Sequence, residues 1–197
     1  MAFLALFAMA AGRGFNAKRS STVDGSANAL PQAGLDDRVG ADDQSAGARA
    51  PDISSLSPQE RADRLYNRVM TLASQGKIDS VQFFAPMAIQ SYLLLAPLGA
   101  DQRYDLGRIG EVVGALPLAK AQADTILREN PNHLLGLILE ARLAVIAGDS
   151  TQLHSYERRL IAAEKSELAK KREEYVRHQD DISIALQQAR KSQAVRS

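Results

Sequence analysis

The chain has 197 residues, enough for one folded domain with a tail or for two very small domains. Its 24 Lys and Arg residues are balanced by 23 Asp and Glu residues, which argues against a nucleic-acid partner held by bulk charge. The absence of cysteine excludes disulfide scaffolds, thiol nucleophiles and cysteine-ligated metal centres.

The N-terminal segment, residues 1–11, is apolar after Met1 and precedes Arg13, Lys18 and Arg19. Ten helical residues span only about 15 Å, half of a bilayer core. Two interpretations stay open: an apolar end or a wrongly assigned start, and an anchor or signal that lacks its beginning. If Met1 is the start, the run is too short to span alone, and the basic residues favour a cytoplasmic side. An apolar extension upstream would favour a membrane-associated or periplasmic protein, which is the location we expect.

Residues 12–56 form a block of different composition, rich in Ala, Gly, Ser and Asp, with no helical or strand period. Such a segment buries too little apolar surface to offset the entropy of ordering it. The sequence predicts a disordered linker, as a tethered domain would need.

The helical body begins at Ser57, where Ser57 and Glu60 flank a proline in the pattern of a capping box. Apolar residues follow at helical spacing, and Gly76 is a suitable end for this first helix. A second helix is predicted over about 79–96, with a kink at Pro86 or a first turn displaced towards it.

The same periodicity predicts four more helices, over residues 101–113, 116–129, 132–147 and from 150 or 151 onwards. Residues 164–191 are dense in charges of both signs and are predicted as one solvated helix with a narrow apolar stripe. That helix either covers the end of a helical stack or serves as a coiled-coil or partner-binding helix. No strand is indicated. These elements divide the chain into a helical domain, 57–167, and a charged terminal helix and tail, 168–197.

Turn-forming and small residues recur at a constant interval. Pro97 and Pro131 lie 34 positions apart, and so do Gly114 and Gly148. Three residues correspond to a small or identical residue 34 positions later: Gly107 to Ala141, Arg108 to Arg142, and Gly110 to Ala144. Small residues in the first helix of a pair let the second helix approach closely, and glycine turns the chain between them. A helix pair repeated every 34 residues is the period of a tetratricopeptide array.

Residues 119–133 resemble the second helix and exit turn of a tetratricopeptide repeat (TPR), and residues 139–149 resemble its first helix and turn. The resemblance covers about 57–167. It implies an all-α, right-handed superhelix of about three helix pairs with a C-terminal capping helix. The middle pair matches best; in the third, Leu153 and Glu157 stand where the second pair has small alanines, and the first pair is degenerate around Pro86.

Candidate residues for chemistry are few. His133, His154 and His178 stand apart, without a ligand-type partner one helical turn away, so we expect no metal site. No nucleophile elbow, phosphate-binding loop or dinucleotide fingerprint is present, so we expect no cofactor and no enzyme activity. The neighbouring acids at 173–174 and 180–181 are interpreted as solvated faces.

The resemblance implies a concave groove lined by the first helix of each pair, which holds a peptide or protein segment. The groove residues would be Tyr66, Met70, Tyr104, Arg108, Glu111, Ile138, Arg142 and Val145. Arg108 and Arg142 would together suit an acidic partner or a free carboxylate. Alternatively, either arginine pairs with an acid of the chain itself, for example Arg142 with Glu140 or Asp149, or is simply solvated. The Asn and Lys set of the family's carboxylate clamp is not matched, so binding of a chaperone C-terminus is not expected.

Two functions are therefore predicted. The first is a non-catalytic adaptor that binds a protein or peptide in this groove, with membrane contact through residues 2–11. The alternative is an accessory or assembly subunit of a membrane-associated complex that uses its convex face or terminal helix.

Overall fold

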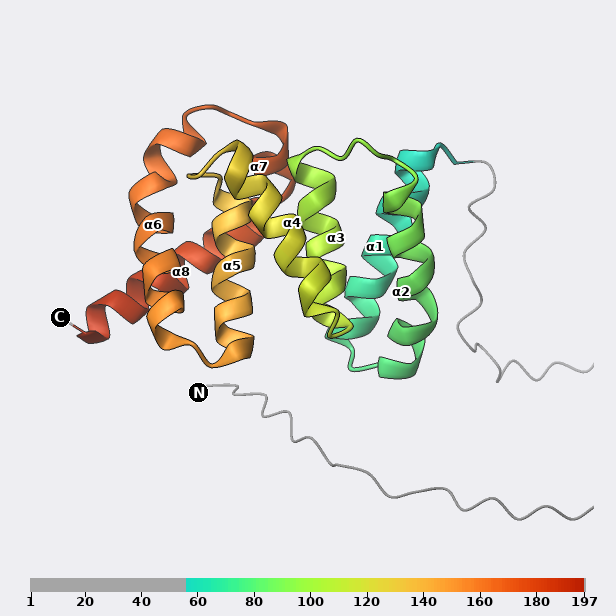
Figure 1. The fold of residues 1–197 in the computed structure, drawn as a ribbon, viewed down its shortest axis with the longest axis horizontal. Coiled ribbons are helices and arrows are strands. Elements are labelled where there is room, and N and C mark those ends of the chain that lie inside the picture. Colours follow the sequence, from blue (N-terminus) through green and yellow to red (C-terminus); the bar gives the residue numbers. More distant parts are fainter. Residues whose placement is uncertain (1–55, 197) are drawn as a thin grey trace, which may run out of the picture. The chain divides into compact units, whose positions relative to one another are not determined.

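The computed structural model describes residues 56–196, which form a body of α-helices (Figure 1). In chain order the helices are α1 (Pro58–Ser74), α2 (Ile78–Leu93), α3 (Ala100–Val112), α4 (Leu116–Glu129), α5 (Leu134–Ala147), α6 (Ser150–Leu168), α7 (Glu173–Arg177) and α8 (Gln179–Arg196). No strand occurs in this part of the chain, which confirms the all-α prediction. The predictions for the apolar segment and for the linker up to residue 55 lie outside the described residues. None of the helices within 56–196 is long and apolar enough to cross a membrane.

Helix α1 begins with the predicted capping box. The backbone N–H of Glu60 donates to Ser57 Oγ at 3.2 Å, and the N–H of Ser57 donates to Glu60 Oε2 at 2.9 Å. Helix α2 begins at Ile78 and continues through Pro86, so its first turn is not displaced towards the proline.

In each of the three helix pairs, one glycine turns the chain between the two helices. Gly76, Gly114 and Gly148 follow α1, α3 and α5 and have φ angles of +69°, +77° and +68°. Glycine adopts this left-handed conformation without the steric cost that other residues incur. The recurring glycines therefore mark the three turns, as predicted.

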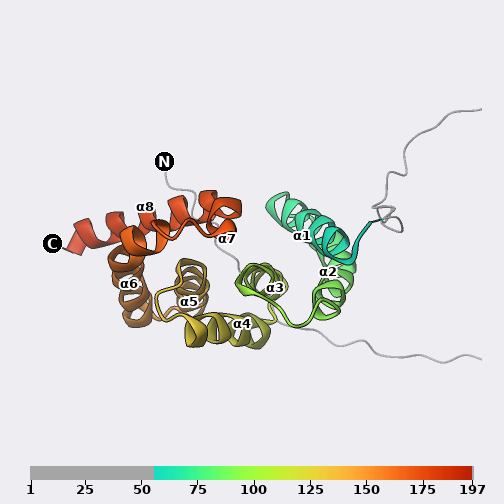
Figure 2. The same cartoon turned by 90° about the horizontal axis from the view of Figure 1, so that it is seen from above.

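The helices pair as hairpins that stack in chain order. Helix α1 packs on α2, α3 on α4 and α5 on α6, and the hairpins meet through α2–α3 and α4–α5 contacts. Helices α1, α3 and α5 also contact one another in sequence along one side of the body, whereas α2, α4 and α6 lie on the other side (Figure 2). We name these two sides the inner face and the outer face.

The small residues of α3 allow close packing. A Cβ atom at Gly110 would lie 3.1 Å from the backbone nitrogen of Ala119, so α3 and α4 approach closely there, as predicted. At Gly107 the nearest atom would be Cδ1 of Leu139, at 2.8 Å. Gly107 thus accommodates α5 of the next hairpin more than the second helix of its own pair, because α3 contacts both neighbours.

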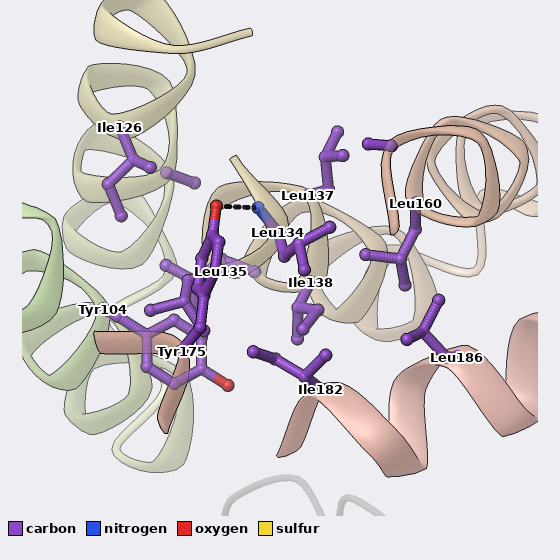
Figure 3. Close-up of a cluster of buried hydrophobic side chains, with 13 residues drawn as sticks. Tyr104, Ile126, Leu134, Leu135, Leu137, Ile138, Leu160, Tyr175, Ile182 and Leu186 are labelled. Atoms are coloured by element: carbon purple, nitrogen blue, oxygen red, sulfur yellow. Dashed lines mark hydrogen bonds between the residues drawn. The ribbon is translucent and has the colours of Figure 1, made fainter. Parts of the chain in front are cut away.

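Two clusters of buried apolar side chains form the core. One lies among α1, α2 and α3 and includes Leu65, Phe84 and Ile109. The other joins α3, α4, α5 and α6 to the C-terminal helices and includes Tyr175 and Ile182 (Figure 3). Helix α3 contributes to both clusters, so it links the two halves of the body.

The C-terminal region differs from the predicted single helix over 164–191. Helix α6 ends at Leu168, the chain turns at residues 169–172, and α7 and α8 run back across the inner face (Figure 2). The physical reason is burial: Tyr175, Ile182 and Leu186 pack into the second core cluster, where each is at most 4% exposed. A straight continuation of α6 would leave these side chains in water, at a cost of about 1.5–3 kcal/mol for each large apolar one.

Candidate functional site

The side chains predicted to line a groove all come from α1, α3 and α5, the helices of the inner face. Helices α7 and α8 cross this face (Figure 2). The structure therefore places the predicted residues in three surroundings, namely beneath α8, around an open pocket, and in the first core cluster on α1; Arg108 and Ile138 belong to the first two.

The covered group is held by α8. Tyr104 has no exposed surface, and its hydroxyl donates to Oδ2 of Asp181 at 2.8 Å. Arg108 is buried too, with Nη1 3.5 Å from the same carboxylate oxygen. Ile138 packs in the same core cluster as Ile182 of α8. The interpretation of Asp181 as part of a solvated face is therefore wrong, because two side chains of α3 bind it to the inner face.

The two predicted groove arginines share one carboxylate of the chain. Nε of Arg142 on α5 lies 2.7 Å from Oε2 and 2.9 Å from Oε1 of Glu111 on α3. Nε of Arg108 lies 3.4 Å from the same Oε2. The structure thus agrees with the alternative interpretation, in which the arginines pair with an acid of the chain, but the acid is Glu111 and not Glu140 or Asp149.

Tyr66 and Met70 on α1 belong to the first core cluster, and Tyr66 is close enough to Arg108 for the guanidinium charge to oppose the rise that burial causes in the pKa of Tyr66. Tyr66 is buried in the first core cluster, and Met70 is half-buried against it. Neither lines the pocket described next.

An open pocket of about 270 Å³ lies between α3, α5, α6 and α8. Among the residues that line it are five of the predicted groove residues, namely Arg108, Glu111, Ile138, Arg142 and Val145. Three aliphatic side chains of its lining stand open to solvent: Val145 is 60% exposed, Ile146 47% and Ile184 52%. Exposed apolar side chains grouped around a hollow are typical of a surface that binds a partner. We name this site the α5–α8 pocket.

A separate polar site lies where α7 meets the first two hairpins. Nη2 of Arg177 is 3.0 Å from Oδ1 of Asp63 and 2.7 Å from Oδ2 of Asp105, and Nη1 of Arg177 pairs with Asp101. The hydroxyl of Tyr92 donates to the same Oδ2 of Asp105 at 2.7 Å. We name this group, three aspartates around one guanidinium, the aspartate junction.

Burial and neighbouring charges shift the pKa values of two carboxylates in the junction. Burial raises the pKa of Asp105 to about 6, although Arg177 and His178 favour its ionised form. Burial also acts on Asp101, but there the hydrogen bond from His178 and the charge of Arg177 outweigh it, and the pKa of Asp101 is lowered. The junction therefore holds one carboxylate that resists ionisation beside one that is stabilised as an anion.

Three side chains of this region could serve as metal ligands by type. Asp101, Asp105 and His178 each place one ligand atom within 4.8 Å of the others. Arg177 contacts both of these aspartates, so the positive charge that such carboxylates need is already supplied by α7. The arrangement fits a structural ion-pair cluster that fastens α7 to the body.

Sequence reasoning missed this junction. His178 and Arg177 lie 77 and 72 positions from their respective partners Asp101 and Asp105, so no local spacing connects them. Asp105 is buried in an amphipathic helix next to Tyr104, where no pattern distinguishes a paired carboxylate from a solvated one. Comparison of the chain with protein-family models, curated proteins and solved structures finds no match to any of them.

Proposed function

We propose that the protein is a non-catalytic adaptor, a tetratricopeptide-like array of three helix pairs, that holds an apolar segment of a partner protein in the α5–α8 pocket. Three hairpins stacked in chain order, each turned by a left-handed glycine, support the repeat assignment and its superhelical arrangement. If residues 1–11 belong to an anchor, they would tether the adaptor to a membrane.

The observation that carries the proposal is the exposed apolar lining of the pocket. Val145, Ile146 and Ile184 lie on two helices that already pack in the body, so the surface is preformed. Burying them against a partner would remove apolar area from water at about 25 cal/mol per Å². Arg142, with its side chain 41% exposed, stands beside them and would give a partner segment a polar contact that sets its direction.

Site-specific photo-crosslinking in cells tests this function. A photo-reactive amino acid replaces Val145 in the pocket or, as a matched control, Ala121 on the exposed surface of α4. We expect a protein adduct of defined mass from position 145 and none from position 121. Adding Ile184→Glu, at a half-exposed position, should abolish the adduct while circular dichroism stays unchanged. An adduct that survives Ile184→Glu, or equal labelling from both positions, would contradict pocket binding.

A second candidate is an accessory or assembly subunit that makes contact through its outer face. Its basis is α2, which carries a single charged residue, Asp79. Phe83 is 58% exposed, on the side of α2 opposite its buried residues, and Leu94, the C-cap residue of the helix, is 74% exposed. A photo-reactive residue at position 83 that gives an adduct, with none from position 145, would favour this second function.

A further inference from the structure

The turn between α6 and α7 lies in a segment whose residues favour helix. Residues 169–172 are Ala, Lys, Lys and Arg, which rank among the strongest helix formers. Nevertheless Lys171 has a φ of +49°, and within residues 56–196 it is the one non-glycine residue with a positive φ. A helix that ends in this left-handed conformation usually places glycine there. The turn is therefore opposed by its own sequence.

A second observation places a mismatch in the same turn. Nε of Arg172 is buried and makes no hydrogen bond within residues 56–196; Oε2 of Glu167 lies 3.9 Å away from it, too far for a hydrogen bond. A buried donor without an acceptor is unfavourable, and a continuous helix would carry this side chain elsewhere. Both features would be relieved if α6 ran straight through 169–172 into α7.

What imposes the turn is the docking of α7 and α8 onto the body. The hydroxyl of Tyr175 donates to Oε2 of Glu167 at 2.8 Å and accepts from the N–H of Leu134 at 3.2 Å. The aspartate junction holds Arg177, and α8 contacts α5 and α6. Each of these contacts joins the terminal helices to the body. The same contacts could form with the body of a second chain, because only the conformation of residues 169–172 directs α7 and α8 to the body of their own chain.

We propose that two copies of this protein exchange α7 and α8, so that the terminal helices of each chain dock on the inner face of the other. In this dimer α6 continues through 169–172 as helix, and the contacts of Tyr175 and Arg177 are re-formed with the second copy. The exchange is symmetric and closed, and it needs no new interface. The exchange is favoured because Lys171 leaves its left-handed backbone conformation and because residues 169–172 become helical. It is opposed by the entropy that two chains lose on association.

Substitutions at Lys171 test the backbone argument. Lys171→Gly relaxes the left-handed turn and disfavours the continuous helix, so both changes favour the monomer. Lys171→Ala removes the same charge, keeps the left-handed penalty and favours helix, so it is the matched control. After refolding over a range of concentrations, size-exclusion chromatography with light scattering should show a dimer for the wild type and Lys171→Ala. For Lys171→Gly the dimerisation should be weaker by at least about tenfold, since both chains contribute. Equal behaviour of the two variants, or a monomer at every concentration for wild type and Lys171→Ala, would overturn the proposal.

Crosslinking distinguishes exchange from any other dimer. Arg190 on α8 pairs with Glu164 on α6, and the natural chain has no cysteine. One preparation carries Glu164→Cys and the other Arg190→Cys; they are refolded together at high concentration and treated with a short bismaleimide. Exchange predicts a covalent link between the two chains, above that of the same proteins mixed after separate dilute refolding. A dimer in light scattering without this link would show that the copies associate through a different surface, and the proposal would be wrong.

Discussion

Replacing Arg177 with alanine isolates the energetic role of the aspartate junction. The substitution removes the guanidinium that contacts Asp63, Asp101 and Asp105, and it leaves Asp105 fully buried without its strongest cation. Breaking a buried ion pair by removing one partner costs about 3–5 kcal/mol. Because the Arg177 side chain is 33% exposed, water reaches the vacated position, and we expect a loss of about 2–3 kcal/mol near neutral pH.

The loss should depend on pH through Asp105. Its folded pKa of about 6 lies above the ordinary value for aspartate of about 3.9, so the folded state binds the proton more tightly than the unfolded state. The stability that this group contributes is therefore present at low pH and is lost as the pH rises through about 6. Without Arg177 the pKa of Asp105 rises further, since its cation is gone. The destabilisation by Arg177→Ala should thus shrink to about 1 kcal/mol at about pH 5, where the carboxyl is neutral.

Urea denaturation followed by circular dichroism at about pH 5 and about pH 8 measures this dependence. Arg190→Ala is the control, since its single ion pair with Glu164 has an exposed partner in Arg190, 54% exposed, and should be worth less than about 1 kcal/mol at either pH. In an Asp105→Asn background the pH dependence of Arg177→Ala should disappear, because the carboxyl that titrates is gone. An equal effect of Arg177→Ala at both pH values, or an effect no larger than that of Arg190→Ala, would refute the reasoning.

Three further predictions concern the packing and the capping of the helices, each measured as a change in the free energy of unfolding. Gly110→Ala places a methyl group 3.1 Å from the backbone nitrogen of Ala119 and should destabilise the folded state by about 1–3 kcal/mol, because the backbone cannot move aside as the end of a side chain can. An unchanged free energy of unfolding would mean that α3 and α4 can move apart at no cost. Ile138→Ala should cost about 2–5 kcal/mol by leaving a cavity beneath α8, and a value near zero would show that α8 does not bury this residue. Ser57→Ala should cost about 1 kcal/mol through the loss of the cap, whereas Ser57→Gly should cost only a few tenths.

The six helices of the hairpins follow from local sequence because each is set by apolar periodicity and by residues at its own ends. Ser57 caps α1, and Gly114 and Gly148 end α3 and α5 with a conformation that other residues adopt only at a cost. Helix α5 begins at Leu134, two residues later than predicted, since Asn130 accepts a hydrogen bond from the N–H of Asn132 and holds the turn.

The C-terminal turn could not be predicted in this way. Nothing in residues 169–172 stops a helix, and the turn exists because Tyr175 and Ile182 find a surface elsewhere in the chain. Periodicity shows that the terminal helix has an apolar stripe, but it does not show which surface receives the stripe.

For the candidate site, helical spacing correctly gathers Arg108 with Glu111 on one face of α3, and Ile138, Arg142 and Val145 on one face of α5. The hydrogen bond between Tyr104 and Asp181 depends on the docking of α8 and joins positions 77 residues apart, so no local sequence pattern predicts it.

The bond between Arg177 and Asp63 spans 114 positions and joins the end of the array to its first hairpin. In an open solenoid every repeat touches only its neighbours, so the terminal units fray first and the energetics are those of a one-dimensional chain. Here α7, which follows the array, is bound to the first hairpin, so the loss of either one weakens the attachment of the other. We therefore expect a single cooperative melting transition in place of stepwise fraying. We also expect folding to be slower than that of a simple helical bundle, because contacts between distant parts of the chain must form.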